Sequence, residues 1–239
     1  MPTNHVVIDP RYCGPPGMGN GGYVAGKLAA FIDGPVEVML RQPTPLGTNL
    51  DICENGEDGL QLKHGETVIA EAHPFPFELE VPEPPSFEEA DAAWGNHPGL
   101  ANHPVPGCFV CGPKRPDGLR ICAGRMPGRD DVATAWTPAA ELADAAGRVL
   151  SEFIWAVLDC PGGFSLGGNQ FIPVLLGKFA VQIVADVIAG EPHVISGWLI
   201  ANEGRKYFTG TAIHTAAGEL CAYTSGTWIA LKDPSILGS

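Results

Sequence analysis

The chain has 239 residues, 45% hydrophobic and 17% charged, which is typical of a soluble globular protein of one large or two small domains. Its 27 acidic and 14 basic side chains give a net charge of −13, which argues against a long nucleic acid as partner. No apolar run approaches about 18 residues, and the N-terminus has no signal-like pattern, so neither a membrane span nor secretion is expected. Seven cysteines without an export signal then predict free thiols in the cytoplasm.

The first predicted elements are a short strand at 5–9 and a helix at 23–32. Asn20 is the expected N-cap of this helix, and Gly34-Pro35 ends it. The helix is unusually poor in side-chain bulk, because its residues include Gly21, Gly22, Ala25, Gly26 and Ala29. Such a helix can approach either a sheet or a ligand closely, and the pattern leaves both interpretations open.

Residues 35–77 read as four strands separated by Gly, Asn and Pro, which predicts an antiparallel sheet wrapped on the first helix. Residues 81–107 are rich in Pro and acidic side chains and show no sustained period. We interpret them as a surface linker, with Phe87 and Trp94 as possible anchors.

The second half repeats this order: a strand at 131–138, a helix at 149–164, and four further strands. Aligning Asn20 with Leu150 superposes the two helices at an offset of 130 residues, which indicates an internal duplication. The second helix is apolar on nearly every side, carries Asp159 near its end, and is expected to stop at Pro161-Gly162-Gly163. A buried carboxylate there needs a partner or a task, whereas a solvated helix-terminal acid would need neither.

Several segments carry a family resemblance. NGGYVAGKLA with RQPTPLGTNL resembles the helix and next strand of acyl-CoA thioesterase-like proteins. CFVCGPKRPDGLRI is similar to the opening of phenylacetate-type hot-dog thioesterases, and NEGRKYFTGTAIHTAAGELCAYTSGTWI to the closing strands of that superfamily. The resemblance covers most of 15–77 and 108–231. It implies an α+β, tandem (double) hot-dog fold, with halves at 1–80 and 108–239 and a linker at 81–107, each half a long helix wrapped by a curved antiparallel sheet.

The resemblance also implies an active site. Related helices open with His-Gly-Gly or Asn-Gly-Gly and carry an acid about nine residues later. Here the pattern is split: Asn20-Gly21-Gly22 is followed by Ala29, while Asp159 is preceded by Leu150, Ser151 and Glu152. An amide and an acid eight residues apart on one helix are separated by about 12 Å along the axis, so they cannot act on one carbonyl. Antiparallel helices would instead combine Gly22 with Asp159 in one complete site, and leave Ser151/Glu152 with Ala29 as an inactive counterpart.

In this hypothesis the N-terminus of the first helix stabilises an oxyanion, Asp159 acts as general base or nucleophile, and Asn20 orients water or thioester. Ser165 and Thr209 are possible polar supports. The family pattern places Arg205, Lys206 and Lys178 near the phosphates of coenzyme A, although a solvated strand end would explain the first two equally well. Phe153, Trp155 and Phe164 are possible walls of an acyl or aryl tunnel. No cofactor is expected beyond coenzyme A as part of the substrate, and a homodimer is expected by analogy.

Cys108 and Cys111 form a CxxC flanked by His97 and His103, which together could supply four zinc ligands. A single CxxC on a Pro/Gly-rich segment is a weak signal, so no metal is predicted. Cys160 is expected to be an inert core thiol. The leading hypothesis is acyl-CoA thioester hydrolysis. The alternatives are a non-catalytic protein that binds acyl-CoA or another hydrophobic ligand, and a structural module that associates through its sheets.

Overall fold

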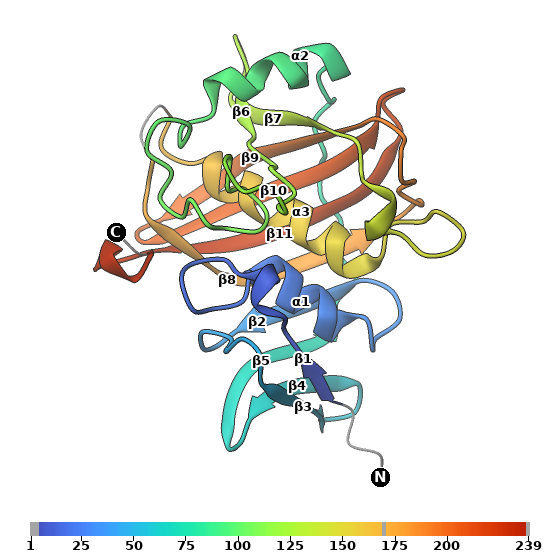
Figure 1. Ribbon diagram of the computed structural model, residues 1–239, viewed down its shortest axis with the longest axis vertical. Coiled ribbons are helices and arrows are strands. Elements are labelled where there is room, and N and C mark those ends of the chain that lie inside the picture. The colour runs from blue at the N-terminus through green and yellow to red at the C-terminus, as the bar shows by residue number, and fades with distance from the viewer. Residues whose placement is uncertain (1–4, 169–170, 238–239) are drawn as a thin grey trace.

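One antiparallel sheet runs through the whole molecule (Figure 1). The computed structural model describes residues 5–168 and 171–237. Within these residues the sheet has 11 strands in the order β1-β3-β4-β5-β2-β8-β11-β10-β9-β7-β6. The strands are β1 (His5–Val7), β2 (Val36–Leu40), β3 (Asn49–Asn55), β4 (Gly59–His64), β5 (Thr67–Pro74), β6 (Gly124–Arg125), β7 (Asp131–Trp136), β8 (Val174–Ile183), β9 (His193–Glu203), β10 (Lys206–Thr215) and β11 (Leu220–Ala230).

The helices are α1 (Gly21–Ala29), α2 (Phe87–Ala93) and α3 (Ser151–Phe164), with 3₁₀ turns η1 (Pro10–Tyr12), η2 (Trp94–Asn96), η3 (Ala140–Leu142) and η4 (Pro234–Leu237). Helices and strands follow one another in the same order in both halves of the chain. Strand, 3₁₀ turn, helix and four strands occur first as β1-η1-α1-β2-β3-β4-β5 and again as β7-η3-α3-β8-β9-β10-β11. The two sets join where β2 pairs with β8, from Val36 opposite Val181 to Met39 opposite Lys178.

The two long helices lie side by side and antiparallel on the sheet (Figure 1). Gly22, at the start of α1, lies against Trp155, Ala156 and Asp159 in the middle of α3, whereas Gly26 lies against Glu152 near its beginning. A Cβ at Gly22 would be 2.6 Å from the Asp159 Cβ, and one at Gly26 would be 2.7 Å from the Glu152 Cα. The small residues of α1 therefore allow the two backbones to approach closely.

The helix α3 does not stop at Pro161, contrary to the sequence prediction, but continues through the two glycines to Phe164. A Cβ at Gly162 would be 2.7 Å from the Thr209 Oγ1, and one at Gly163 would be 3.1 Å from the Trp228 ring. These glycines allow the last turn to lie directly on β10 and β11. The two glycines allow close packing here, whereas their low helix propensity predicts the end of a helix.

The segment predicted as a surface linker contains the helix α2, which the sequence prediction did not include. Ser86 caps α2 in a capping box with Glu89, and the helix packs on β7. A small second core lies beneath it, with Phe87 at its edge; its buried members are Ala90, Ala93, Met126, Ala133 and Val194. Trp94, the other expected anchor, is 41% exposed.

The main core lies between the sheet and the two long helices. Its members come from both halves and include Val24, Leu28, Val157, Leu158 and Phe179. A single core across the β2–β8 junction holds α1 and α3 in a fixed relation, which positions the site described next. Within the described residues, no helix combines the length and apolarity needed to cross a membrane.

Candidate active site

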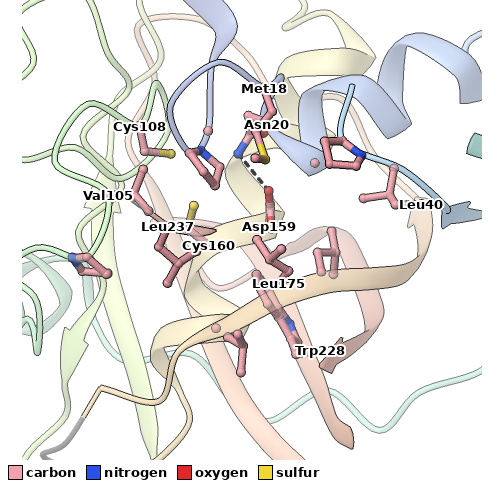
Figure 2. Close-up of a pocket in the computed structure, with 18 of the residues that line it drawn as sticks. Met18, Asn20, Leu40, Val105, Cys108, Asp159, Cys160, Leu175, Trp228 and Leu237 are labelled. Atoms are coloured by element: carbon pink, nitrogen blue, oxygen red, sulfur yellow. Dashed lines mark hydrogen bonds between the residues drawn. The ribbon is translucent and has the colours of Figure 1, made fainter. Parts of the chain in front are cut away.

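The N-terminus of α1 is capped by Asn20, as the sequence predicts. The Asn20 Oδ1 accepts a hydrogen bond of 2.9 Å from the Tyr23 backbone N–H. This fixes the amide so that its Nδ2 points away from the helix, where it donates to the Asp159 Oδ2 over 2.9 Å (Figure 2). One side chain thus caps α1 and contacts the acid on α3.

Asp159 approaches the same helix end from α3. Its Oδ2 also accepts a hydrogen bond of 2.9 Å from the Gly22 backbone N–H. The side chain is 4% exposed. Desolvation by burial raises the pKa of this carboxyl to about 7, against the opposing effects of the Gly22 and Asn20 hydrogen bonds. Asp159 is therefore poised between its protonation states near neutral pH.

The acid borders an apolar cavity of about 380 Å³. Both halves of the chain contribute to its wall: Met18, Asn20, Gly21 and Leu40 from the first half, and Asp159, Phe164, Leu176 and Trp228 from the second. Figure 2 shows Asp159 with Asn20 on one side and Leu175 and Trp228 on the other. The site is thus a carboxylate and a helix N-terminus at the wall of a mostly apolar pocket.

Of the three aromatic residues expected to line a tunnel, only Phe164 borders this cavity. Phe153 is buried against Tyr12 and Tyr23, and Trp155 packs edge-on against Phe179. Phe153 and Trp155 do not line this cavity, because both side chains leave α3 on sides that face core elements. Trp228 of β11, which the sequence reasoning missed, is a cavity-wall aromatic instead.

The cations predicted to bind coenzyme A do not border the cavity. Arg205 is exposed and donates to the Ala230 carbonyl, and Lys206 is exposed at the start of β10. Lys178 forms an ion pair of 2.8 Å with Glu37. Arg41, directly after β2, does line the cavity, with a half-exposed side chain that also pairs with Glu71. Arg41 is the first residue of RQPTPLGTNL, a segment that carries the family resemblance. Arg41 was not among the cations predicted from the sequence.

The two possible polar supports of Asp159 have other partners. Ser165 donates to the Gly162 carbonyl, and the Thr209 Oγ1 accepts a hydrogen bond of 3.1 Å from the Trp228 Nε1. Thr209 therefore orients a cavity-wall aromatic, and Asn20 and Gly22 are the groups that hold the acid.

The opposite ends of the two helices form no equivalent arrangement. Ala29 supplies no carboxylate there, and Leu150, the N-cap of α3, makes no side-chain cap. Glu152 in the first turn of α3 pairs with Lys27 of α1 at 3.2 Å. The end of α1 and the start of α3 are thus joined by the ion pair between Lys27 and Glu152. The start of α1 is joined to α3 by the buried Asp159.

The fold is similar to solved thioesterase-superfamily structures, although no family model and no curated protein matches the sequence. A protein provisionally named a thioesterase, from Novosphingobium aromaticivorans, has a TM-score of 0.62 and 11% identity, covering 95% of this chain and 94% of that one. The tesB protein of Mycobacterium avium subsp. paratuberculosis gives 0.57 and 14%, covering 97% and 89%. A protein named as a thioesterase superfamily member has 21% identity and a TM-score of 0.46. The match covers 50% of this chain and 58% of that protein. The two matches that cover nearly the whole chain show that it shares their overall fold.

Proposed function

We propose that the protein hydrolyses acyl-CoA thioesters at the site formed by Asp159 and the N-terminus of α1. The observation that carries this proposal is the position of a buried carboxylate against the first turn of an antiparallel helix, at the wall of an apolar cavity. The cavity suits the acyl or aryl group of the substrate. Arg41 at its wall is the cation best placed for the phosphates of coenzyme A.

The same geometry supports a tandem of two hot-dog units, with halves at 1–80 and 108–239. Each half would contribute one part of a single composite site, the helix N-terminus from the first and the acid from the second. The connecting segment at 81–107 belongs structurally with the second half, because α2 packs on β7. A cytoplasmic location and a homodimer stay predictions.

The proposed reaction adds water across the thioester bond. Asp159 either takes a proton from water or attacks the carbonyl carbon directly, and the carbonyl oxygen gains negative charge in the tetrahedral intermediate. The Gly22 N–H is engaged by Asp159, whereas the Gly21 N–H has no hydrogen-bond partner among the described residues and Gly21 borders the cavity. Gly21 is thus the free backbone donor for the oxyanion, aided by the helix dipole. The C–S bond then breaks and the thiolate leaves. In the general-base route the thiolate takes up the proton that Asp159 removed from water. In the nucleophilic route water hydrolyses the mixed anhydride and supplies the proton that the thiolate takes up.

Hydrolysis of a panel of short, medium, long and aryl acyl-CoAs by the purified protein tests this proposal, with the released thiol as the readout. We expect turnover of at least one class. Absence of turnover on every member, combined with a rise in melting temperature on adding an acyl-CoA, would replace hydrolysis with the ligand-binding alternative.

A single-turnover reaction in ¹⁸O-water tests for direct attack by Asp159. Hydrolysis of a mixed anhydride at its aspartyl carbon leaves one ¹⁸O in the Asp159 carboxyl, which peptide mass spectrometry detects. Label in the free acid alone is the result expected when Asp159 activates water, and it also follows from hydrolysis of the anhydride at its acyl carbon.

A further inference from the structure

Three buried thiols meet at the cavity wall beside Asp159. The sulfur atoms of Cys108, Cys111 and Cys160 all lie within 4.8 Å of one another. All three side chains are at most 9% exposed, and all three residues line the cavity. Figure 2 shows the sulfurs of Cys108 and Cys160 on one side of Asp159. Two of the thiols come from the loop before β6 and the third from α3, so the fold brings them together across 49 residues or more of sequence.

The loop that carries Cys108 and Cys111 forms a tight turn. The Cys108 carbonyl accepts a hydrogen bond of 3.0 Å from the Gly112 N–H, which closes a tight turn around the CxxC. The turn places the side chains of Cys108 and Cys111 on one short segment, and both lie against Cys160 of α3. A thiolate is the form of cysteine that binds metal ions.

The neighbouring polar groups do not complete this cluster. The Cys122 thiol donates to the Cys111 carbonyl at 3.4 Å, and Cys13 lies against the Gly107 carbonyl and Arg115. The His103 Nδ1 accepts a hydrogen bond from the Val105 N–H, so its proton is on Nε2, which has no lone pair for a metal. His97 donates from Nδ1 to the Ala123 carbonyl and is not part of the three-sulfur group. The residue that lies with Cys108 and Cys111 is therefore Cys160, and neither His97 nor His103 is part of the group.

Three buried sulfurs in this arrangement have the chemistry of a zinc site. Several thiolates cannot share an apolar interior unless a cation balances their charge. In a tetrahedral site with Zn–S bonds of about 2.3 Å the sulfurs are about 3.8 Å apart, which lies within the observed bound. Thiolate sets select zinc and other soft or borderline ions over magnesium or calcium.

We propose that Cys108, Cys111 and Cys160 bind one zinc ion, with the fourth coordination position open to the cavity. Binding converts the three thiols to thiolates and releases their protons, and water from the cavity fills the fourth position. The ion joins the loop that carries Cys108 to the last turns of α3. It therefore ties together two elements of the cavity wall without taking part in the contacts of Asn20 and Gly22 with Asp159.

The test measures metal binding by the full chain, prepared with a reductant and without oxygen, independently of any thioesterase assay. After a chelator and desalting, zinc is added, the excess is removed, and protein-bound zinc is counted by elemental analysis. Cobalt is then used as a spectroscopic probe, since thiolate ligands give it intense near-ultraviolet charge-transfer bands. We expect one zinc per chain, and cobalt bands with an intensity that corresponds to three thiolates.

The variants Cys108→Ser, Cys111→Ser and Cys160→Ser should each lose stoichiometric zinc and weaken the cobalt bands. Cys221→Ser removes a buried thiol of β11 that is not part of the cluster, and should bind zinc like the parent protein. Substoichiometric zinc and no thiolate bands in the parent protein would overturn the proposal, even if the cluster variants fail to fold. So would retention of zinc in Cys160→Ser, because a CxxC site independent of α3 would then be responsible.

Discussion

The Asp159 carboxylate on α3 accepts a hydrogen bond from the backbone N–H of Gly22, the second residue of α1, over 2.9 Å. The two residues are 137 positions apart in the chain. Their contact depends on close helix packing, since any side chain at Gly22 would collide with Asp159 and with the Trp155 carbonyl. The glycine that lets the two helices pack closely is therefore also the residue whose backbone N–H donates to Asp159.

Replacing Asp159 with Asn should lower kcat/KM by at least about a hundredfold on any acyl-CoA that the parent protein hydrolyses. The Asn oxygen can still accept from Gly22, so the fold is expected to persist while the charge is lost. Thiol release and circular dichroism provide the two measurements. The matched control is Glu152→Gln, which removes the acid at the opposite ends of the helices and should change turnover little. Equal losses in the two variants would contradict the assignment of Asp159.

Substituting Gly22 or Gly26 with Ala should destabilise the protein by about 1–3 kcal/mol in either case, because each new methyl group overlaps α3. Only Gly22 contacts Asp159. Among molecules that remain folded, Gly22→Ala should therefore lose more turnover than Gly26→Ala. Urea unfolding gives the stability of each variant, and assays below its melting temperature give the activity. A larger loss of turnover in Gly26→Ala would contradict the assignment of the active site to Gly22 and Asp159.

Arg41→Gln should raise KM for an acyl-CoA by roughly threefold to tenfold, the effect of losing about 1 kcal/mol of a partly exposed charge interaction. Steady-state kinetics should show no such rise for the matching thioester of N-acetylcysteamine, which lacks the nucleotide. Lys178→Gln is the control, since Lys178 pairs with Glu37 away from the cavity. A KM that rises equally for both thioesters would mean that Arg41 shapes the cavity and does not recognise phosphate.

His97 should make the fold sensitive to acid. Burial lowers the pKa of its imidazole to about 4, against a backbone hydrogen bond to Ala123 and with His103 as a nearby charge. The unfolded chain takes up this proton near pH 6.5, well before the folded chain does, so stability falls as the pH drops from 6.5 towards 4. The loss at pH 4.5 relative to pH 7.5 amounts to about 2–3 kcal/mol for this one group.

The variant His97→Gln, which keeps a donor for the Ala123 carbonyl, isolates that contribution. Urea unfolding at pH 7.5 and pH 4.5 should show a smaller acid-induced loss in the variant than in the parent protein. Titration of groups that do not interact with His97 is common to both proteins and cancels in the comparison. An identical loss in the two would place the acid sensitivity elsewhere.

The repeated order of helix and strands, the cap at Asn20 and the acid near the end of an apolar helix could all be predicted from the sequence. These features are encoded locally: a capping residue, a period of apolar side chains, and an acid in an apolar helix. The split between Asn20-Gly21-Gly22 and Asp159 was visible as well, because each half carries what the other lacks.

The choice of side chains that face the cavity depends on tertiary packing. Phe153 and Trp155 lie on the same helix as Phe164, yet the packing of α1 and β8 covers the first two. Likewise, Pro161-Gly162-Gly163 is a helix stop by local propensity, but contacts with β10 and β11 keep it helical. The meeting of Cys160 with Cys108 and Cys111 has no sequence signature, because no spacing rule connects a loop to the far end of a helix. Such contacts depend on how the two halves dock, which is a property of the whole core.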